Sequence, residues 1–331
     1  MRCLVTDTLV TSESLSGFSD LLPMSRVVSR RDRWPDTDQL ASVAEGTSWL
    51  AVTRCEDAAT VAEMLQMAQR TLAHGATPHN NIYGLVVHAA ECLPSSLAAD
   101  FPEAISGLLR RPQPDDLLVL AADSLRGRHV AIALPELLPE LNDRTQCLPR
   151  CPQPRRFPEI GPGRPEISIA VLRPAVRRAA RHLAASEELE KCLEAGLLLL
   201  WDHPEESHEI SQTMEGHGNP RTADYWHGIM HRREPDADNA TWWFRKVGRH
   251  PVLGQLGAGL LNWMRQLQAT PAMIAVAQGL LRSDLSLDPF RLIELSTAAL
   301  RRPGSDEDNT ARMVQYLEML LLLRFCVRPQ F

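Results

Sequence analysis

A run of prolines divides this 331-residue chain into two parts with different hydrophobic patterns. The segment CLPRCPQPRRFPEIGPGR, residues 147–164, contains five prolines, and Pro165 follows it directly. Each proline fixes its own φ angle and disfavours the helical conformation of the residue before it, so an extended connector is expected. We predict an N-terminal domain at 1–148, a proline-rich linker at 149–165 and a second domain at 166–331. The alternative is a long surface loop inside one domain.

Short apolar runs rich in β-branched residues characterise the part before the linker. They predict buried strands at residues 48–53, 83–88, 116–121 and 129–134. Between the first two strands, residues 57–75 carry apolar side chains at helical spacing, from a capping Asp57 to Gly75. A turn at 124–128 predicts a hairpin between the last two strands, which would make the sheet mixed.

Helical periodicity dominates after the linker. Residues 166–172 predict one more strand, and residues 174–202 predict one long helix or two. Further helices are expected at 222–233, 253–269, 271–282, 289–301 and 308–324. The predicted fold class is therefore α+β, or α/β, with a small mixed-sheet N-terminal α/β domain followed by an all-α domain.

Composition and motifs exclude several classes of function. Lys191 and Lys246 are the only lysines, and neither follows a glycine-rich loop, which excludes a P-loop nucleotide site. The chain contains no GxSxG or GxGxxG motif, so hydrolase-elbow and dinucleotide sites are not supported. The net charge of −6 is too small to predict a nucleic-acid or membrane partner. A small-molecule or protein partner and the oligomeric state stay open.

The cysteines and the N-terminus indicate the compartment. Seven cysteines are spread widely along the chain, which is typical of reduced thiols rather than of a disulfide framework. The first residues show no signal-peptide pattern, and the apolar run at 197–201 is far shorter than the ~20 residues of a membrane span. We expect a soluble cytoplasmic protein.

The side chains suited to chemistry gather in one stretch. Six of the eleven histidines lie between residues 203 and 250. Four tryptophans lie in or beside the same stretch, namely Trp201, Trp226, Trp242 and Trp243. A site is expected here more than anywhere else in the chain.

A His-x-x-x-His-x-x-Glu pattern on the helix at 222–233 is the sharpest feature. His227, His231 and Glu234 fall on one helical face, from which two imidazoles and a carboxylate could bind one divalent metal. His208 and Asp202 are the candidates for a further ligand. Zn, Fe and Mn are the metals considered. The pattern lacks the glutamate of HExxH, so protease chemistry is not indicated.

Neighbouring residues suggest ligand contacts, each with an alternative. Arg232 could bind an anion, but Arg232 and Arg233 point about 100° apart on a helix, so one of them is expected to face solvent. Trp226 and Trp243 could wall a pocket or pack in a core. Asp236 opens a DADN run resembling the start of a calcium loop, although the later glycine and glutamate are missing.

The segment YWHGIMHRREPDADNATWWFRKVGRHP, preceded by WDHPEESHEISQ, resembles one in uncharacterised bacterial and fungal proteins. The shared pattern is WHxIxHRRExDxxNxxxWFxxVGxHP, and the resemblance covers residues 200–252. It implies no activity, cofactor or fold, and only supports the location of the site.

Three functions compete at this stage. The leading hypothesis is a divalent-metal-binding helical protein with metal-dependent hydrolytic or oxidative activity. The alternative is a non-enzymatic binding or scaffold protein whose His, Arg and Glu residues form a structural polar network. The third is metal-free acid/base chemistry by His227 or His231 beside Glu234. Whether the protein is an enzyme is left open.

Overall fold

The computed structural model describes residues 157–165 and 168–329, and before them six short strands and seven further positions. Those positions are Met64, Leu65, Gln66, Ala68, Leu97, Phe101 and Leu108. The chain divides into two compact units, Met1–Leu93 with Pro102–Arg156, and Pro94–Phe101 with Phe157–Phe331. Each unit is described by itself, and the domain boundaries at 148 and 165 stay predictions.

The first unit contains a mixed sheet. Its strands are β1 (Leu4–Val5), β2 (Ser25–Ser29), β3 (Trp49–Thr53), β4 (Gly84–Val87), β5 (Leu117–Ala121) and β6 (Thr145–Leu148). They lie in the order β1-β2-β3-β5-β4-β6. Strand β5 runs antiparallel to both of its neighbours, β3 and β4, while the remaining pairs are parallel.

Three of the strands expected from sequence correspond to β3, β4 and β5. Leu50–Val52 of β3 and Leu117–Leu120 of β5 are buried, which suits central strands with continuous apolar runs. The described positions of the helix expected at 57–75 are helical. The strand expected at 129–134 and the turn before it lie outside the described residues.

The second unit is helical, as the sequence predicts. Its helices are α6 (Ile169–Leu183), α7 (Glu187–Leu200), α8 (Pro204–Thr213), α9 (Thr222–Arg233), α10 (Ala237–Val247), α11 (Pro251–Gln266), α12 (Pro271–Gln278), α13 (Pro289–Ala299) and α14 (Asp306–Val327). Four of them, α8, α11, α12 and α13, begin with proline, where its missing N–H costs no hydrogen bond. No helix among the described residues is both long and apolar enough to cross a bilayer.

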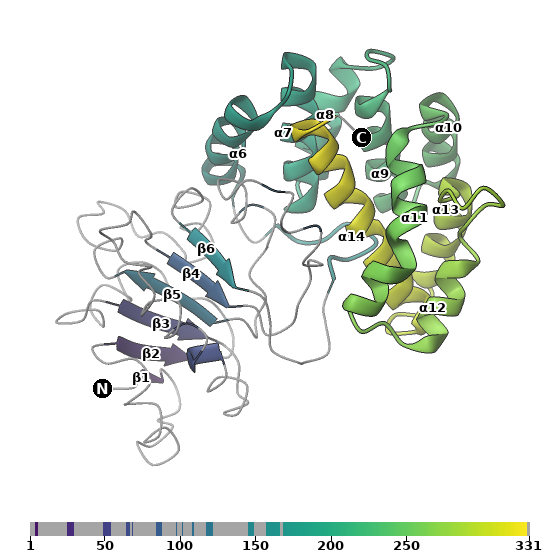
Figure 1. The fold of residues 1–331 in the computed structure, drawn as a ribbon. Helices are drawn as coiled ribbons and strands as arrows, with labels where there is room; N and C mark the ends of the chain where they lie inside the picture. The colour runs from purple at the N-terminus through teal and green to yellow at the C-terminus, as the bar shows by residue number, and fades with distance from the viewer. Residues whose placement is uncertain are drawn as a thin grey trace. The chain divides into compact units, whose positions relative to one another are not determined.

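Helix α14 is the centre of this unit. It packs against α7, α11, α12 and α13, and Figure 1 shows it in yellow among the green and teal helices. Its residues from Thr310 to Leu323 are all buried except Arg312. A helix that is covered on every side has no amphipathic stripe, so its buried polar residues need partners inside the protein. These residues are Asp308, Thr310, Gln315 and Glu318.

The strand expected at 166–172 is wrong, because α6 begins at Ile169. The buried residues of α6 are Leu172, Ala175, Val176, Ala179 and Ala180. Their spacing of three and four residues makes one helical face that includes the end of the apolar run. The apolar face therefore continues from this short run into α6, and the packing of that face favours a helix although the run is rich in β-branched residues. The expectation of one or two helices at 174–202 resolves into α6 and α7.

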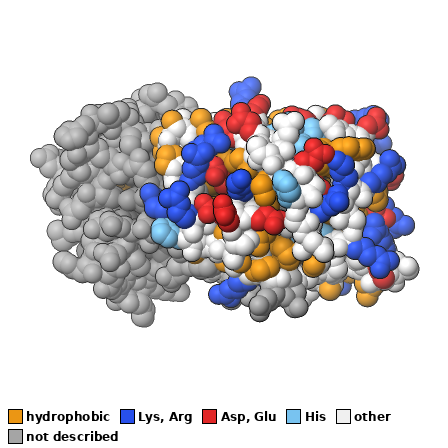
Figure 2. All heavy atoms as spheres, turned by 90° about the horizontal axis from the view of Figure 1, so that it is seen from above, with side chains coloured by type: hydrophobic (Ala, Val, Ile, Leu, Met, Phe, Trp, Pro, Cys, Tyr) orange, Lys and Arg blue, Asp and Glu red, His pale blue; other side chains and the backbone are white. Residues whose placement is uncertain are grey.

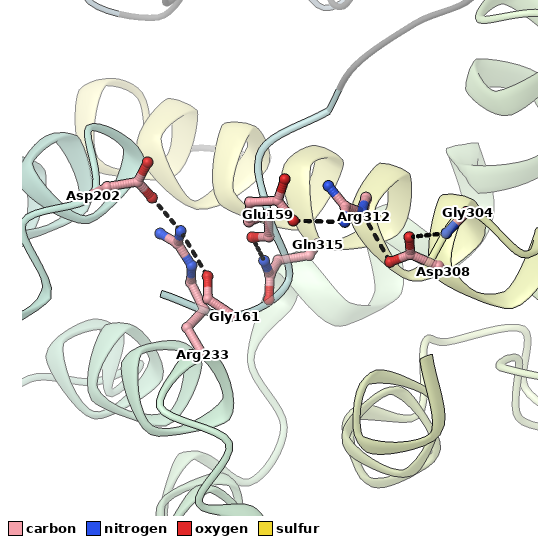
Figure 3. A network of polar contacts seen from close by, with 8 residues as sticks. All are labelled: Glu159, Gly161, Asp202, Arg233, Gly304, Asp308, Arg312 and Gln315. Carbon is pink, nitrogen blue, oxygen red and sulfur yellow. Dashed lines mark hydrogen bonds and ion pairs between the residues drawn. The ribbon is translucent and has the colours of Figure 1, made fainter. Parts of the chain in front are cut away.

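The described end of the proline-rich segment packs on the helices. Phe157 and Ile160 are buried, and the Phe157 ring lies 5.9 Å from that of Tyr316 on α14. Figure 3 shows polar contacts beside them, in which Glu159 pairs with Arg312 and its backbone carbonyl accepts from Gln315. Residues 157–161 are therefore fixed to α14 by apolar and polar contacts together.

Candidate metal centre

Helix α9 is buried along its whole length although it carries two histidines and two arginines. All twelve residues from Thr222 to Arg233 are buried, and α7, α8 and α10 pack against the helix. Polar groups in such a position must find partners on the neighbouring helices. The function of each side chain on α9 therefore depends on which helix it faces.

Three histidines converge between α8 and α9. One candidate ligand atom from each of His208, His227 and His231 lies within 4.8 Å of the other two. The rings of His227 and His231 stack with centroids 4.9 Å apart. The ring of His208 stands edge-on to both, at 4.6 Å from His227 and 5.3 Å from His231. Two parallel imidazoles thus meet a third one at nearly a right angle.

The helical hairpin explains how His208 reaches the other two. Residues 214–221 join α8 to α9, and such a short connection places adjacent helices side by side in opposite directions. His227 and His231 stand one turn apart on one face of α9. His208 lies opposite the space between them, which accounts for its contacts with both rings.

Trp243 of α10 closes one side of the cluster. Its ring stacks on that of His227, with centroids 3.7 Å apart and planes tilted by 19°. Trp242 stands edge-on to Trp243 and is 46% exposed. The Lys246 ammonium lies 3.6 Å from the Trp242 ring centroid and 4.7 Å from that of Trp243. Trp243 therefore holds the His227 ring in place, and the two tryptophans together hold the Lys246 ammonium nearby.

His231 has a carboxylate partner. Its Nδ1 atom lies 3.0 Å from Oε2 of Glu234, three residues later. Donation of Nδ1–H to that oxygen leaves the lone pair of the ring on Nε2. The Nδ2 atom of Asn239 lies 3.2 Å from each ring nitrogen of His231, so the amide can donate to this lone pair. Glu234 is thus a hydrogen-bond partner of the cluster and not one of its three converging groups.

The environment of the two histidines of α9 favours their neutral form. Burial is the main reason that the pKa of His227 is lowered from 6.5 to about 3, with smaller contributions from the nearby His208, His231 and Lys246. Burial also lowers the pKa of His231, against the opposite effect of Glu234. Neutral imidazole is the form that binds metal ions. His227 therefore stays in the metal-binding form well below neutral pH, and the lowered pKa of His231 favours the same form.

Asp202, expected as a further ligand, lies elsewhere. Its carboxylate pairs with Arg233 at the end of α9, and both side chains are buried. Figure 3 shows Arg233 between Asp202 and the backbone carbonyl of Gly161, to which it also donates. A side chain at Gly163 would collide with the Asp202 carboxylate. Asp202 therefore joins α7, α9 and the segment at 157–165.

Arg232 also makes buried internal contacts. Its guanidinium pairs with Glu318 of α14 and donates to Gln315 at 3.3 Å. The hydroxyl of Tyr225 donates to the same carboxylate at 3.0 Å. The expectation that Arg232 or Arg233 faces solvent is wrong, because each is only 2% exposed. Each arginine instead reaches a carboxylate on another segment.

The other two expected ligand contacts have local partners. Trp226 is fully buried and faces α7, where a side chain at Gly196 would collide with its ring. Asp236 caps α10 by accepting from the Asn239 backbone N–H at 3.0 Å. Of the expected contact residues, Trp243 is the one that touches the cluster through the His227 ring.

The structure thus brings together three of the expected ligands, His208, His227 and His231. Glu234 and Trp243 contact this cluster. The other expected site residues have partners elsewhere, namely Asp202, Arg232, Trp226 and Asp236. Lys246 and Asn239 were missed, because their contacts depend on the packing of α10. On the face seen in Figure 2, acidic and basic side chains are interspersed, with histidines among them.

Comparisons with known proteins leave the site to be interpreted from its own geometry. No protein-family model, curated protein or solved structure matches the chain.

Proposed function

We propose that His208, His227 and His231 bind one divalent metal ion that keeps an open coordination position. The observation that carries this proposal is the convergence of three histidine ligand atoms within 4.8 Å, from two helices that pack together. Three neutral imidazoles with one open position form the ligand set of a catalytic zinc site. Binding would draw the three nitrogens closer, to the roughly 3.3 Å that tetrahedral Zn–N bonds of about 2.0 Å require.

The neutral state of the rings supports this function. The imidazoles of His227 and His231 are buried, and burial opposes the protonation of each. A divalent cation would use the lone pairs that such a cluster presents. The carboxylate of Glu234 on the Nδ1 of His231 matches the outer-shell arrangement that orients metal-bound histidines.

The ligand type favours zinc over iron or manganese. Imidazole suits both zinc and iron, but non-haem iron oxygenases use two histidines and a carboxylate, and manganese prefers carboxylate and water oxygens. The only carboxylate in hydrogen-bond contact with the cluster, among the described residues, is Glu234, which is occupied by His231. A zinc ion held by three histidines lowers the pKa of a bound water to near neutrality. Hydrolytic chemistry is therefore our choice over oxidative chemistry.

The experiment is metal analysis of untagged protein by plasma mass spectrometry. His208→Ala is the best variant, because His208 is the least buried of the three and its loss disturbs packing least. His217→Ala is the matched control, since His217 is exposed and lies in the loop that follows α8. We expect one ion per chain in the wild type and in the control, and almost none in His208→Ala.

A wild-type protein that takes up no zinc, even after incubation with it, would overturn the proposal. The cluster would then be a structural network that braces α8, α9 and α10. In that case the His208→Ala substitution should change thermal stability equally with and without a chelator, whereas a metal protein loses the difference when it is stripped.

A further inference from the structure

A second carboxylate lies on the histidine face of α9. Asp224 precedes His227 by three residues, so the two stand one turn apart on the same face. Asp224 is fully buried. Its Oδ1 accepts the backbone N–H of Gly216 at 2.9 Å, which ties the loop after α8 to the start of α9. Its Oδ2 lies 3.6 Å from Arg221 and has no hydrogen-bond partner among the described residues.

His227 also has a ring nitrogen whose hydrogen bonding is not satisfied. Its Nδ1 is buried and also lacks a hydrogen-bond partner among the described residues. A buried polar atom without a partner costs about 1 to 3 kcal/mol, so an ordered water is the usual solution. One acceptor and one ring nitrogen, a helical turn apart, could share such a water.

Helix α8 supplies further polar groups at the same place. The hydroxyls of Ser207 and Ser211 are buried and have no hydrogen-bond partner in the described structure. Ser211 follows His208 by about one turn, and the histidine contacts align His208 with His227 and His231. In an antiparallel hairpin we therefore expect Ser211 near the preceding turn of α9, which carries Asp224. A buried water needs two to four polar partners, roughly. Groups on both helices can provide them.

A carboxylate and a histidine already pair one turn along the helix, in the reverse sequence order. His231 and Glu234 are also three residues apart, and there the Nδ1 to Oε2 contact is direct at 3.0 Å. The sequence Asp-x-x-His-x-x-x-His-x-x-Glu therefore places a carboxylate three residues before His227 and another three residues after His231. The HxxxHxxE pattern predicts the second pair but does not include Asp224.

We propose that Asp224 is a positioning residue that accepts the Nδ1–H of His227 through one bound water held between α8 and α9. This inference rests on the proposed metal site. By holding the proton on Nδ1, Asp224 leaves the Nε2 lone pair of His227 for the ion, as Glu234 does for His231. Asp224 touches neither the ion nor a substrate.

Asp224→Asn reverses the polarity of this contact. The N–H of Gly216 needs an acceptor, so it takes the amide oxygen of the new side chain. The amide NH₂ then occupies the place of Oδ2 and donates where the carboxylate accepted. The proton of His227 is expected to move to Nε2, the nitrogen that should bind the metal.

The test combines two measurements. Long-range ¹⁵N–¹H spectra of metal-free protein labelled at histidine report the tautomer of His227. We expect Nδ1–H in the wild type and Nε2–H in Asp224→Asn. Zinc affinity, measured by competition with a chromophoric chelator, should fall by roughly 10- to 100-fold in the variant. Asp238→Asn on α10 is the control, since Asp238 is exposed, and it should change neither.

Two outcomes overturn the inference. One is an Nε2–H tautomer of His227 in the metal-free wild type, a result that holds even if Asp224→Asn fails to fold. The other is a folded Asp224→Asn protein with wild-type tautomer and wild-type zinc affinity. A wild type that binds no zinc but has the Nδ1–H tautomer, lost in the variant, would overturn the proposed function and leave the Asp224 contact standing.

Discussion

His227 stacks on Trp243 with ring centroids 3.7 Å apart, so α10 fixes the plane of an imidazole that α9 carries. His231 stacks on the same imidazole at 4.9 Å. Because its ring stacks on both Trp243 and His231, the His227 side chain has little freedom to rotate. An imidazole that is already oriented loses less conformational entropy when it binds an ion.

Replacing Trp243 should therefore affect stability and metal affinity together. Trp243 is 4% exposed, and Trp243→Ala should lower the free energy of unfolding by about 3 to 5 kcal/mol. Trp243→Phe keeps a ring against His227 and should restore most of the zinc affinity. The neighbouring Trp242 is 46% exposed, so Trp242→Ala should cost about 1 kcal/mol or less. Urea unfolding measures the stability of all three variants, and chelator competition measures their zinc affinity. Equal losses for both alanine variants would contradict the stacking role.

The ion pair between Arg232 and Glu318 leads to a prediction about the fold. Both side chains are almost fully buried. Glu318→Ala leaves the guanidinium and the Tyr225 hydroxyl without their carboxylate, and should destabilise the protein by about 3 to 5 kcal/mol. The exposed pair of Arg181 and Glu190 is the comparison, where Glu190→Ala should cost about 1 kcal/mol or less.

The double variant Arg232→Met with Glu318→Leu checks the cause. Removing both charges leaves no uncompensated ion in the core, so much of the stability lost in Glu318→Ala should return. A double variant as unstable as Glu318→Ala would mean that lost packing, and not the stranded charge, explains the effect.

Sequence patterns were sufficient for elements with a clear period. The bounds of α9 match the expected 222–233, since its start and its proline stop are local signals. Helices α8 and α10 were not expected. The buried residues of α8 include Ser207 and Ser211, so its inner face carries no apolar stripe for a periodicity argument to find.

The site was located but its composition was only partly foreseen. Histidines at spacing four on one helix are visible in sequence, and so is Glu234. The role of His208 depends on how α8 pairs with α9, and the fate of Asp202 depends on Arg233, 31 residues away. A local sequence pattern does not show which carboxylate or histidine the tertiary packing will bring to the site.

Glu234 should affect zinc affinity through His231. Glu234→Gln replaces a charged acceptor by a neutral amide, which weakens its hold on the Nδ1–H of His231. Zinc affinity should fall by roughly 10- to 100-fold, as for other outer-shell partners of metal-bound histidines. Chelator competition measures the change. Glu209→Gln, an exposed substitution on α8, serves as the control; equal affinities in both variants would remove Glu234 from the site.

His250 should make the fold sensitive to acid. It caps α11 because its Nδ1 accepts the Val252 backbone N–H at 3.3 Å, while its Nε2 lies 3.2 Å from the Thr222 hydroxyl. Burial lowers the pKa of His250 from 6.5 to about 3. The unfolded chain therefore takes up a proton below about pH 6.5, whereas the folded chain does so only near pH 3.

Neutral His250 therefore contributes its full stabilisation above about pH 6.5, the pKa of the ring in the unfolded chain. This contribution declines as the pH falls toward about 3, the pKa of the ring in the folded chain. The slope from one such group is about 1.4 kcal/mol per pH unit. His250→Asn keeps a capping oxygen without a titrating ring. Urea unfolding with a chelator present, from about pH 7 to about pH 4, should show a shallower loss of stability in the variant by that slope. Parallel curves for the two proteins would mean that His250 is protonated in the fold, and that the cap at α11 survives its charge.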